Sequence, residues 1–172
     1  MLQNIKEKKI RKKFVKALSK SLENKEISQK EIKTVGIITL HSIAKDYKLK
    51  DQISTVLNVN NVHQFCFKKF HKSDEVSYHQ FTEKDIDWKG EFVNTNLESF
   101  LNQSFDLLIG YFNTNHLYLE KAVLESMATF KVGFANVNSS LFDIEIAEKI
   151  ENSHQFFHEL KKYLQILKKL KK

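Results

Sequence analysis

Hydroxyl, imidazole and amide side chains lie at the ends of four apolar segments of this 172-residue sequence. Such groups donate and accept hydrogen bonds, and a ring of them suits a sugar, a base or another small polar ligand. Loops are commonly polar and asparagine favours turns, so the same residues are also expected where no ligand binds. The candidate ligand-binding rim consists of Thr39, His41 and Ser42 at the first segment, His71 after the second, Asn113 and Asn115 after the third, and Asn136 and Asn138 at the fourth.

Motifs for nucleotide-dependent or nucleophilic catalysis are absent from the sequence. The turns after the first and third apolar segments, HSIAKD and NTNHLYLE, contain no glycine, so neither forms the glycine-rich phosphate cradle of a Walker or dinucleotide motif. No GxSxG elbow occurs, and the single cysteine, Cys66, lies between two phenylalanines as in a buried strand. We therefore predict no catalytic residue and no cofactor.

Two pairs of residues have a spacing that could serve a metal ion. His154 and His158 are four residues apart, as are His116 and Glu120, so each pair would share one face of a helix. A zinc site needs a third and usually a fourth ligand, and no motif supplies them. We expect histidines on the surface or at helix caps, and no metal.

Two carboxylates in the segment FTEKDIDWKGEF could point the same way. Asp85 and Asp87 are two residues apart, and paired carboxylates can perform acid–base chemistry. A solvated loop explains the same pattern, with Trp88, the only tryptophan, anchoring the loop to the body. We favour the loop.

The strongest electrostatic feature is the basic N-terminal segment. Residues 1–33 hold 11 Lys and Arg against 4 acids, and residues 149–172 hold 7 against 2, whereas residues 34–148 hold 10 against 15. The net charge of +7 therefore arises at the two ends of the chain and not in its body. The candidate surface for an anionic partner consists of Lys8, Lys9, Arg11, Lys12, Lys13 and Lys16.

Three interpretations of this basic segment stay open. It can be the solvated face of a packing helix, a contact for nucleic acid or the ribosome, or a contact for an anionic membrane surface or a protein. A nucleic-acid contact would be independent of base sequence, because arginine, whose planar fork reads bases, occurs only at Arg11. If both basic ends pack on the same sheet face, they form one joint basic surface.

The periodicity of apolar residues predicts helices alternating with strands. Residues 2–30 read as a Lys-rich amphipathic helix with Ile10, Phe14 and Leu18 on its apolar stripe. Continuous or alternating apolar runs predict strands, and LFDIEIA is ambiguous between a fifth strand and a helical turn. The predicted strands cover 34–40, 62–70, 105–112 and 130–137, and the other predicted helices cover 42–57, 97–103, 115–128 and the chain from Asn152 or Ser153 onward.

This alternation predicts an α/β fold with right-handed crossovers and a small, open, mainly parallel Rossmann-like sheet of four or five strands. We expect the order 2-1-3-4, which places the rim residues beyond the carboxyl ends of the strands, where ligands bind in such sheets. We expect residues 1–32 to form the basic helix, packed on or projecting from the body, and residues 33–172 to form a single domain ending in a second amphipathic helix. The longest apolar runs, VGIITL and DLLIGYF, are far too short to span a membrane, and we expect a cytoplasmic protein.

The sequence also resembles a family of short bacterial proteins known only as a domain of unknown function. The resemblance rests on IKEKKIRKKF, VGIITL, FTEKDIDWKGEF, FDLLIGYF and FKVGFANVN in this order, and it implies no catalytic residues. Residues 105–137 are also similar to the N-terminal half of heptosyltransferase-like glycosyltransferases. Those enzymes need a second domain of similar size and a glycine-rich turn where this chain has HSIAKD.

Taken together, these patterns predict a non-catalytic binding or adaptor protein that contacts an anionic partner through its basic terminal helices. A glycosyltransferase-like or nucleotide- and sugar-binding domain with its site at the strand ends is one alternative. A peripheral membrane protein anchored by the N-terminal helix is another. The oligomeric state stays open.

Overall fold

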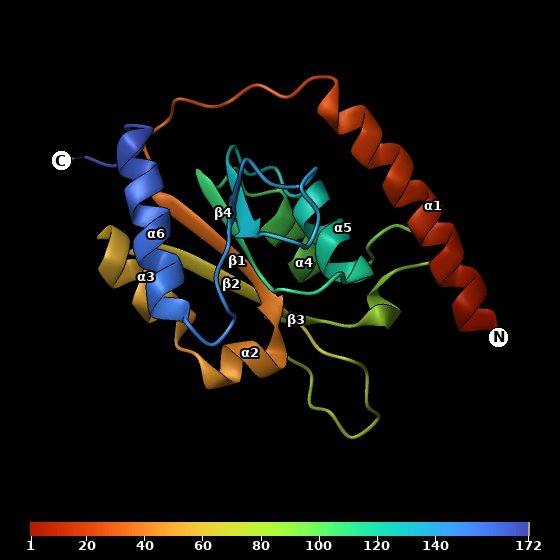
Figure 1. Cartoon of the computed structure of the whole chain (residues 1–172). Coiled ribbons are helices and arrows are strands. Elements are labelled where there is room, and N and C mark those ends of the chain that lie inside the picture. The colour runs from red at the N-terminus through yellow and green to blue at the C-terminus, as the bar shows by residue number, and fades with distance from the viewer. Residues whose placement is uncertain (172) are drawn as a thin grey trace.

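Strands β1 (Thr34–Leu40) and β4 (Leu107–Tyr111) lie side by side at the centre of an open parallel sheet in the computed structural model, which describes residues 1–171 (Figure 1). All of β4, and all of β1 except its two end residues, are buried. Parallel strands that are covered on both faces read as continuous apolar runs, which explains why these segments were predicted well. The other strands of the described residues are β2 (Asn61–Phe67), β3 (Gln80–Phe81), β5 (Lys131–Phe134) and β6 (Ile144–Ile146).

The strand order is β3-β2-β1-β4-β5-β6, and every pair of neighbouring strands is parallel. The α/β class and the predicted order 2-1-3-4 are confirmed, because the four predicted strands are β2, β1, β4 and β5. The ambiguous LFDIEIA segment supplies β6. Strand β3 was missed, since two residues are too few to show an alternating pattern.

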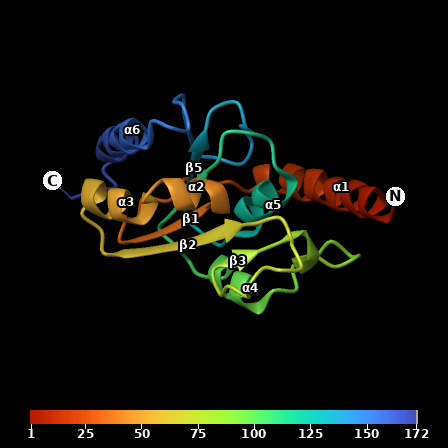
Figure 2. The same ribbon diagram turned by 90° about the horizontal axis from the view of Figure 1, so that it is seen from below.

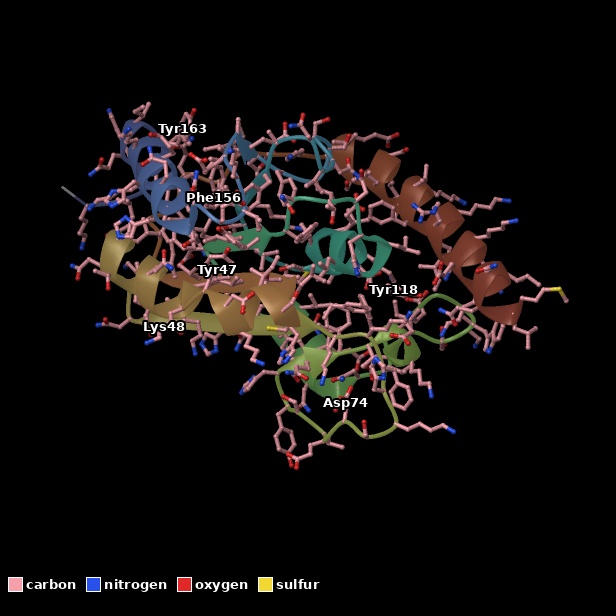
Figure 3. All side chains as sticks on the ribbon, turned by 60° about the horizontal axis from the view of Figure 1, so that its bottom comes forward. Tyr47, Lys48, Asp74, Tyr118, Phe156 and Tyr163 are labelled. Carbon is pink, nitrogen blue, oxygen red and sulfur yellow. The ribbon has the colours of Figure 1, made fainter. Side chains whose placement is uncertain are left out.

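Helices cover both faces of the sheet (Figures 1 and 2). Two stacked aromatic pairs show which helix packs on which face. The ring centres of Phe134 and Phe156 of the C-terminal helix are 4.4 Å apart, whereas those of Phe67 and Tyr118 on the opposite face are 5.3 Å apart; Figure 3 labels Phe156 and Tyr118. The helices are α1 (Leu2–Leu22), α2 (His41–Asp46), α3 (Leu49–Leu57), α4 (Thr95–Leu101), α5 (Leu117–Glu125) and α6 (Ser153–Ile166), with a 3-10 turn at Glu83–Asp85.

Helix α1 lies along α5 and buries Ile10 and Phe14, as its apolar stripe predicted. The prediction that it continues to residue 30 is wrong, because the helix ends at Leu22. The following linker is held in a non-helical path by the C-terminal segment: the Ile32 N–H donates to the Lys169 carbonyl at 2.9 Å, and the Lys169 ammonium binds the carbonyl of Ser28. A tertiary contact thus overrides a helix-compatible composition.

Helix α6 begins at Ser153 with Asn152 at its N-cap position, as predicted, and packs against α3. The two basic ends of the chain therefore lie on opposite faces of the sheet (Figure 2). The joint basic surface that we expected for packing on one face does not form. None of the helices among the described residues is long and apolar enough to cross a membrane.

Several predicted boundaries need correction. The segment 42–57 is two helices and not one, because Tyr47 adopts an extended conformation between α2 and α3. Strand β2 ends at Phe67 and does not reach residue 70. Trp88 does not anchor its loop, since its side chain is 53% exposed; the buried Ile86 and Phe92 do so instead.

Phe142 covers two glycines of neighbouring central strands, and this contact yields a stability prediction. A Cβ atom at Gly133 would overlap the Phe142 ring, and one at Gly110 would lie 2.9 Å from it. We expect Gly133→Ala to lower the free energy of unfolding by about 1–3 kcal/mol and Phe142→Ala by about 3–5 kcal/mol. In urea unfolding followed by circular dichroism, Gly133→Ala should cost much less in the Phe142→Ala background. An equal cost in both backgrounds would contradict this packing.

Cys66 is buried in β2, and we expect it to react slowly with alkylating agents. Burial raises the pKa of its thiol from 9.0 to about 11, so the reactive thiolate is about 100-fold scarcer. Mass spectrometry after iodoacetamide treatment at pH 8 should find the native thiol unmodified while the chain unfolded in guanidinium chloride is alkylated rapidly. Fast alkylation of the native protein would show that β2 opens.

Candidate functional site

One residue of the predicted rim, Thr39, is bound between the carboxyl ends of β1 and β4. Thr39 is fully buried, and its hydroxyl donates to the Tyr111 carbonyl at 2.7 Å. The Tyr111 hydroxyl in turn donates to the Ile150 carbonyl at 2.8 Å, which ties the segment before α6 to the end of β4. The Thr39 hydroxyl is therefore already hydrogen-bonded within the fold.

The residues after β1 and β2 lie apart from this pair. His41 begins α2, and its Nδ1 lies 2.8 Å from the side-chain amide nitrogen of Gln80 at the edge strand β3. Ser42 is exposed on α2. His71 is exposed in the loop after β2, where its carbonyl accepts the N–H of Asp74 at 3.1 Å.

Two rim asparagines lie at the buried carboxylate of Glu120. This contact was not predicted from the sequence. Glu120, which is 4% exposed, accepts the His116 N–H at 2.8 Å and the side-chain amide of Asn138 at 3.1 Å. Asn115 lies 3.5 Å from the same carboxylate and donates to the Val137 carbonyl at 2.6 Å. These contacts join the loop before α5 to the loop after β5.

The remaining rim residues do not converge. Asn113 and Asn136 are both exposed, and Asn136 has a left-handed φ of 70°, a conformation that asparagine tolerates. The rim therefore stays a prediction, and the two cavities that we describe below are lined by other residues.

The three histidines with metal-like spacing lie at a helix cap or on the surface, where we expected them. His116 is the N-cap of α5, where its Nδ1 accepts the Leu119 N–H, and burial lowers its pKa. His154 and His158 are exposed on α6, with their ring centres 4.9 Å apart and their planes tilted. Within residues 1–171, no group of three or more His, Cys, Asp and Glu side chains is arranged to hold a metal ion.

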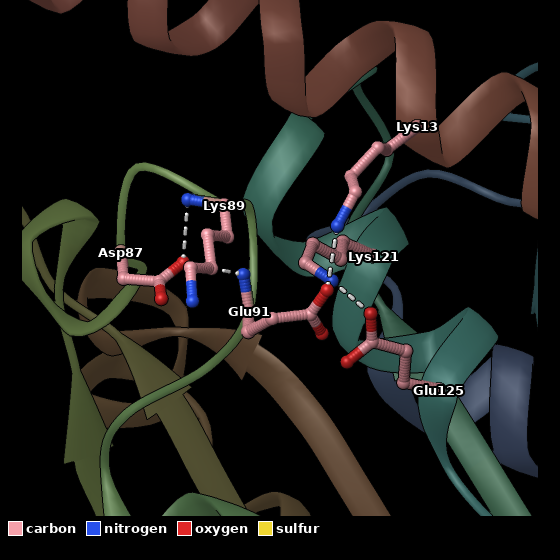
Figure 4. Close-up of polar contacts among 6 residues, drawn as sticks. All are labelled: Lys13, Asp87, Lys89, Glu91, Lys121 and Glu125. Carbon is pink, nitrogen blue, oxygen red and sulfur yellow. Dashed lines mark hydrogen bonds and ion pairs between the residues drawn. The ribbon is translucent and has the colours of Figure 1, made fainter.

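Asp85 and Asp87 serve their own loop. Asp85 accepts the Thr82 N–H at 2.6 Å and closes a capping box. Asp87 accepts the backbone N–H groups of Lys89 and Glu91 at 2.8 and 2.9 Å, and these hydrogen bonds lower its pKa (Figure 4). Both carboxylates are therefore occupied by local hydrogen bonds, as expected for a structured loop.

The inward side of α1 uses some of its charges to bind the body. The Lys13 ammonium forms an ion pair of 2.6 Å with Glu91 (Figure 4), and Lys6 donates to the Glu83 carbonyl at 3.3 Å. Glu7, the only acid of the helix, accepts the hydroxyl of Tyr118 at 3.1 Å. Docking of the helix thus removes its only carboxylate from the outer side.

The outer side of α1 carries only positive charge. We call its five exposed cations the basic face: Lys8, Lys9, Arg11, Lys12 and Lys16. None of the five has an ion pair among the residues that the structure describes. Of the predicted surface for an anionic partner, Lys13 alone is paired, and the other five residues are placed together.

The Glu120 network yields a second stability prediction. All its partners donate to the carboxylate, so Glu120→Gln would turn an amide donor toward them. We expect a loss of about 1–3 kcal/mol in the free energy of unfolding with the fold preserved. Urea unfolding should show no comparable loss for the exposed Glu75→Gln control. If the two variants unfolded at the same midpoint, the network would not contribute to stability.

Comparison with known proteins adds the family and no activity. No curated protein and no solved structure gives a significant match to this chain. The similarity of residues 105–137 to heptosyltransferase-like enzymes therefore receives no support. A family model described as a family of unknown function, DUF6913, matches residues 6–167, in agreement with the resemblance to a family without an assigned function. The chain belongs to the DUF6913 family.

Proposed function

We propose that this protein is a non-catalytic binding protein whose basic face contacts an anionic partner, and that this partner is a nucleic acid. The observation that carries the proposal is the arrangement of charge on α1. Five exposed cations share the outer side of the helix, whereas its only acid, Glu7, is turned inward onto Tyr118. Because this face has no carboxylate, none of its own charges repels a polyanion.

The dimensions of α1 suit a phosphate backbone. Its basic face covers residues 8–16, roughly 12 Å along the helix axis, so these cations can contact a few consecutive phosphates. Four of the five cations are lysines, which bind phosphate as point charges and read no bases. The expected interaction is therefore strongly salt-dependent and independent of base sequence.

Neutralising the basic face should weaken binding to single-stranded RNA. We expect the variant with all five residues changed to Gln to lose at least about tenfold in affinity. The magnitude of its log–log slope of affinity against salt should fall by up to about 3.5, because each lost phosphate contact removes about 0.7. Fluorescence anisotropy with a labelled RNA of mixed sequence measures both quantities.

A matched control variant removes the same charge elsewhere. Changing five exposed lysines outside α1 to Gln leaves the same net charge: Lys45, Lys48, Lys50, Lys162 and Lys168. The proposal requires this control to retain most of the affinity. An equal loss in both variants would reduce the effect to net charge, and an unchanged salt slope in the first variant would refute the basic face.

A second candidate partner, an anionic membrane surface, is favoured by the apolar side chains on the exposed part of α1. Leu2 is 67% exposed and Ile5 is 53% exposed, close to the lysines of the basic face. Apolar and cationic side chains together are typical of helices that lie in a membrane interface. For this function, Leu2→Ser with Ile5→Ser should abolish flotation with phosphatidylserine vesicles and leave RNA binding unchanged. Flotation that is insensitive to these changes would exclude insertion of the helix.

A further inference from the structure

We propose that a cavity between α1 and α5 is a binding site for a small amphipathic anion, a carboxylate with an aliphatic chain. The cavity has a volume of about 360 Å³, which is in the lower part of the range of small-molecule sites, roughly 300–1,000 Å³. It lies beside the inward side of α1, so it is separate from the basic face except at Lys16, whose side chain contributes to both.

The cavity exists because the two helices touch closely over only part of their length. Helix α1 is anchored by the buried Ile10 and Phe14, whereas Leu22 at its end is exposed. Beyond Phe14 the helices leave the cavity between them, and a second cavity of about 220 Å³, under the linker, is also lined by Leu124 of α5. In this C-terminal half of the helix, Leu18 is half-buried against the core and Leu22 is exposed.

The walls of the cavity combine an apolar surface with cations. Phe14, Ala17 and Leu124 provide apolar surface from both helices. Gly90, which has a left-handed φ of 82°, brings the loop after the 3-10 turn against α1, since a Cβ atom there would meet the Lys13 side chain at 3.3 Å. This apolar surface suits the aliphatic body of a ligand.

The charges around the cavity favour an anion. Four lysines and two glutamates line it, and the glutamates are engaged: Glu91 pairs with Lys13, and Glu125 pairs with Lys121 (Figure 4). Lys16 and Lys20 have no carboxylate partner among the described residues. They supply two cations for the carboxylate of a ligand, one helical turn apart.

Lys121 strengthens the preference for an anion. Its side chain is almost fully buried and lies 4.8 Å from the centre of the Phe92 ring. Burial lowers its pKa to about 8, while the carboxylate of Glu91 opposes the shift. A buried ammonium gains more free energy from a nearby negative charge than an exposed one does, because less water screens the interaction.

Isothermal titration calorimetry with decanoate tests the proposal on the full chain. We expect saturable binding of one decanoate per chain, and at least tenfold weaker binding of decanol, which has the same chain length and no charge. Lys16→Gln with Lys20→Gln should weaken decanoate binding about tenfold. Absence of decanoate binding to the unchanged protein would overturn the proposal, as would equal binding of decanol.

Two tryptophan variants locate the bound ligand. Ala17→Trp fills the cavity without changing charge and should weaken decanoate binding at least tenfold. Val15→Trp places the same side chain on the outer side of α1, where Val15 is 55% exposed, and should leave binding unchanged. Equal effects of the two would place the ligand elsewhere. Circular dichroism checks that both variants fold, and the lysine variants decide the matter if Ala17→Trp does not.

Decanoate binding in this cavity does not depend on nucleic-acid binding by the basic face. Changing Lys8, Lys9, Arg11 and Lys12 to Gln removes most of the basic face and none of the cavity lining. That variant should bind decanoate as the unchanged protein does. If it loses decanoate binding, the ligand lies on the outer side of α1 and the cavity is not the site.

Discussion

The burial of β1 and β4 on both faces is the constraint on which the rest of the structure depends. Every side chain of β4 is buried, and the polar Thr39 of β1 is accommodated only because its hydroxyl donates to the Tyr111 carbonyl. A parallel sheet of this kind needs a helical layer on each face. Helix α6 packs with α3 in one layer, and α1 extends the other layer by packing on α5. The basic helices at the two ends of the chain therefore cover the sheet as part of the fold, and only their outer sides are left for a partner.

The same packing decides which charges face outward. Burial of Ile10 and Phe14 fixes the rotation of α1 about its axis, and this rotation turns Glu7 toward Tyr118. As a result, the outer side of this lysine-rich helix carries positive charges and no carboxylate. At the other end of the chain, docking has the opposite effect, because it buries Lys169 over the ring of Phe130 and against the linker.

The polar groups at the strand ends show how a fold can use residues that suit a ligand site. Glu120 gathers Asn138 and the backbone of His116, and the Tyr111 hydroxyl binds the segment before α6. Each contact satisfies a buried polar atom, and among the described residues no buried side-chain nitrogen or oxygen lacks a partner. At the cavity beside α1 the polar groups are of another kind, because Lys16 and Lys20 are exposed and have no carboxylate partner in the described structure.

The sequence by itself determined the α/β class, the four segments that form β1, β2, β4 and β5, and the presence of a basic amphipathic helix at each end of the chain. It did so because apolar runs and helical stripes are local patterns that burial enforces residue by residue. Only the tertiary structure decided that α1 ends at Leu22, that Glu120 binds Asn138, and that a cavity lies between parts of α1 and α5. These features depend on segments far apart in the chain, such as Ser28 and Lys169, and no local pattern encodes the distance between them.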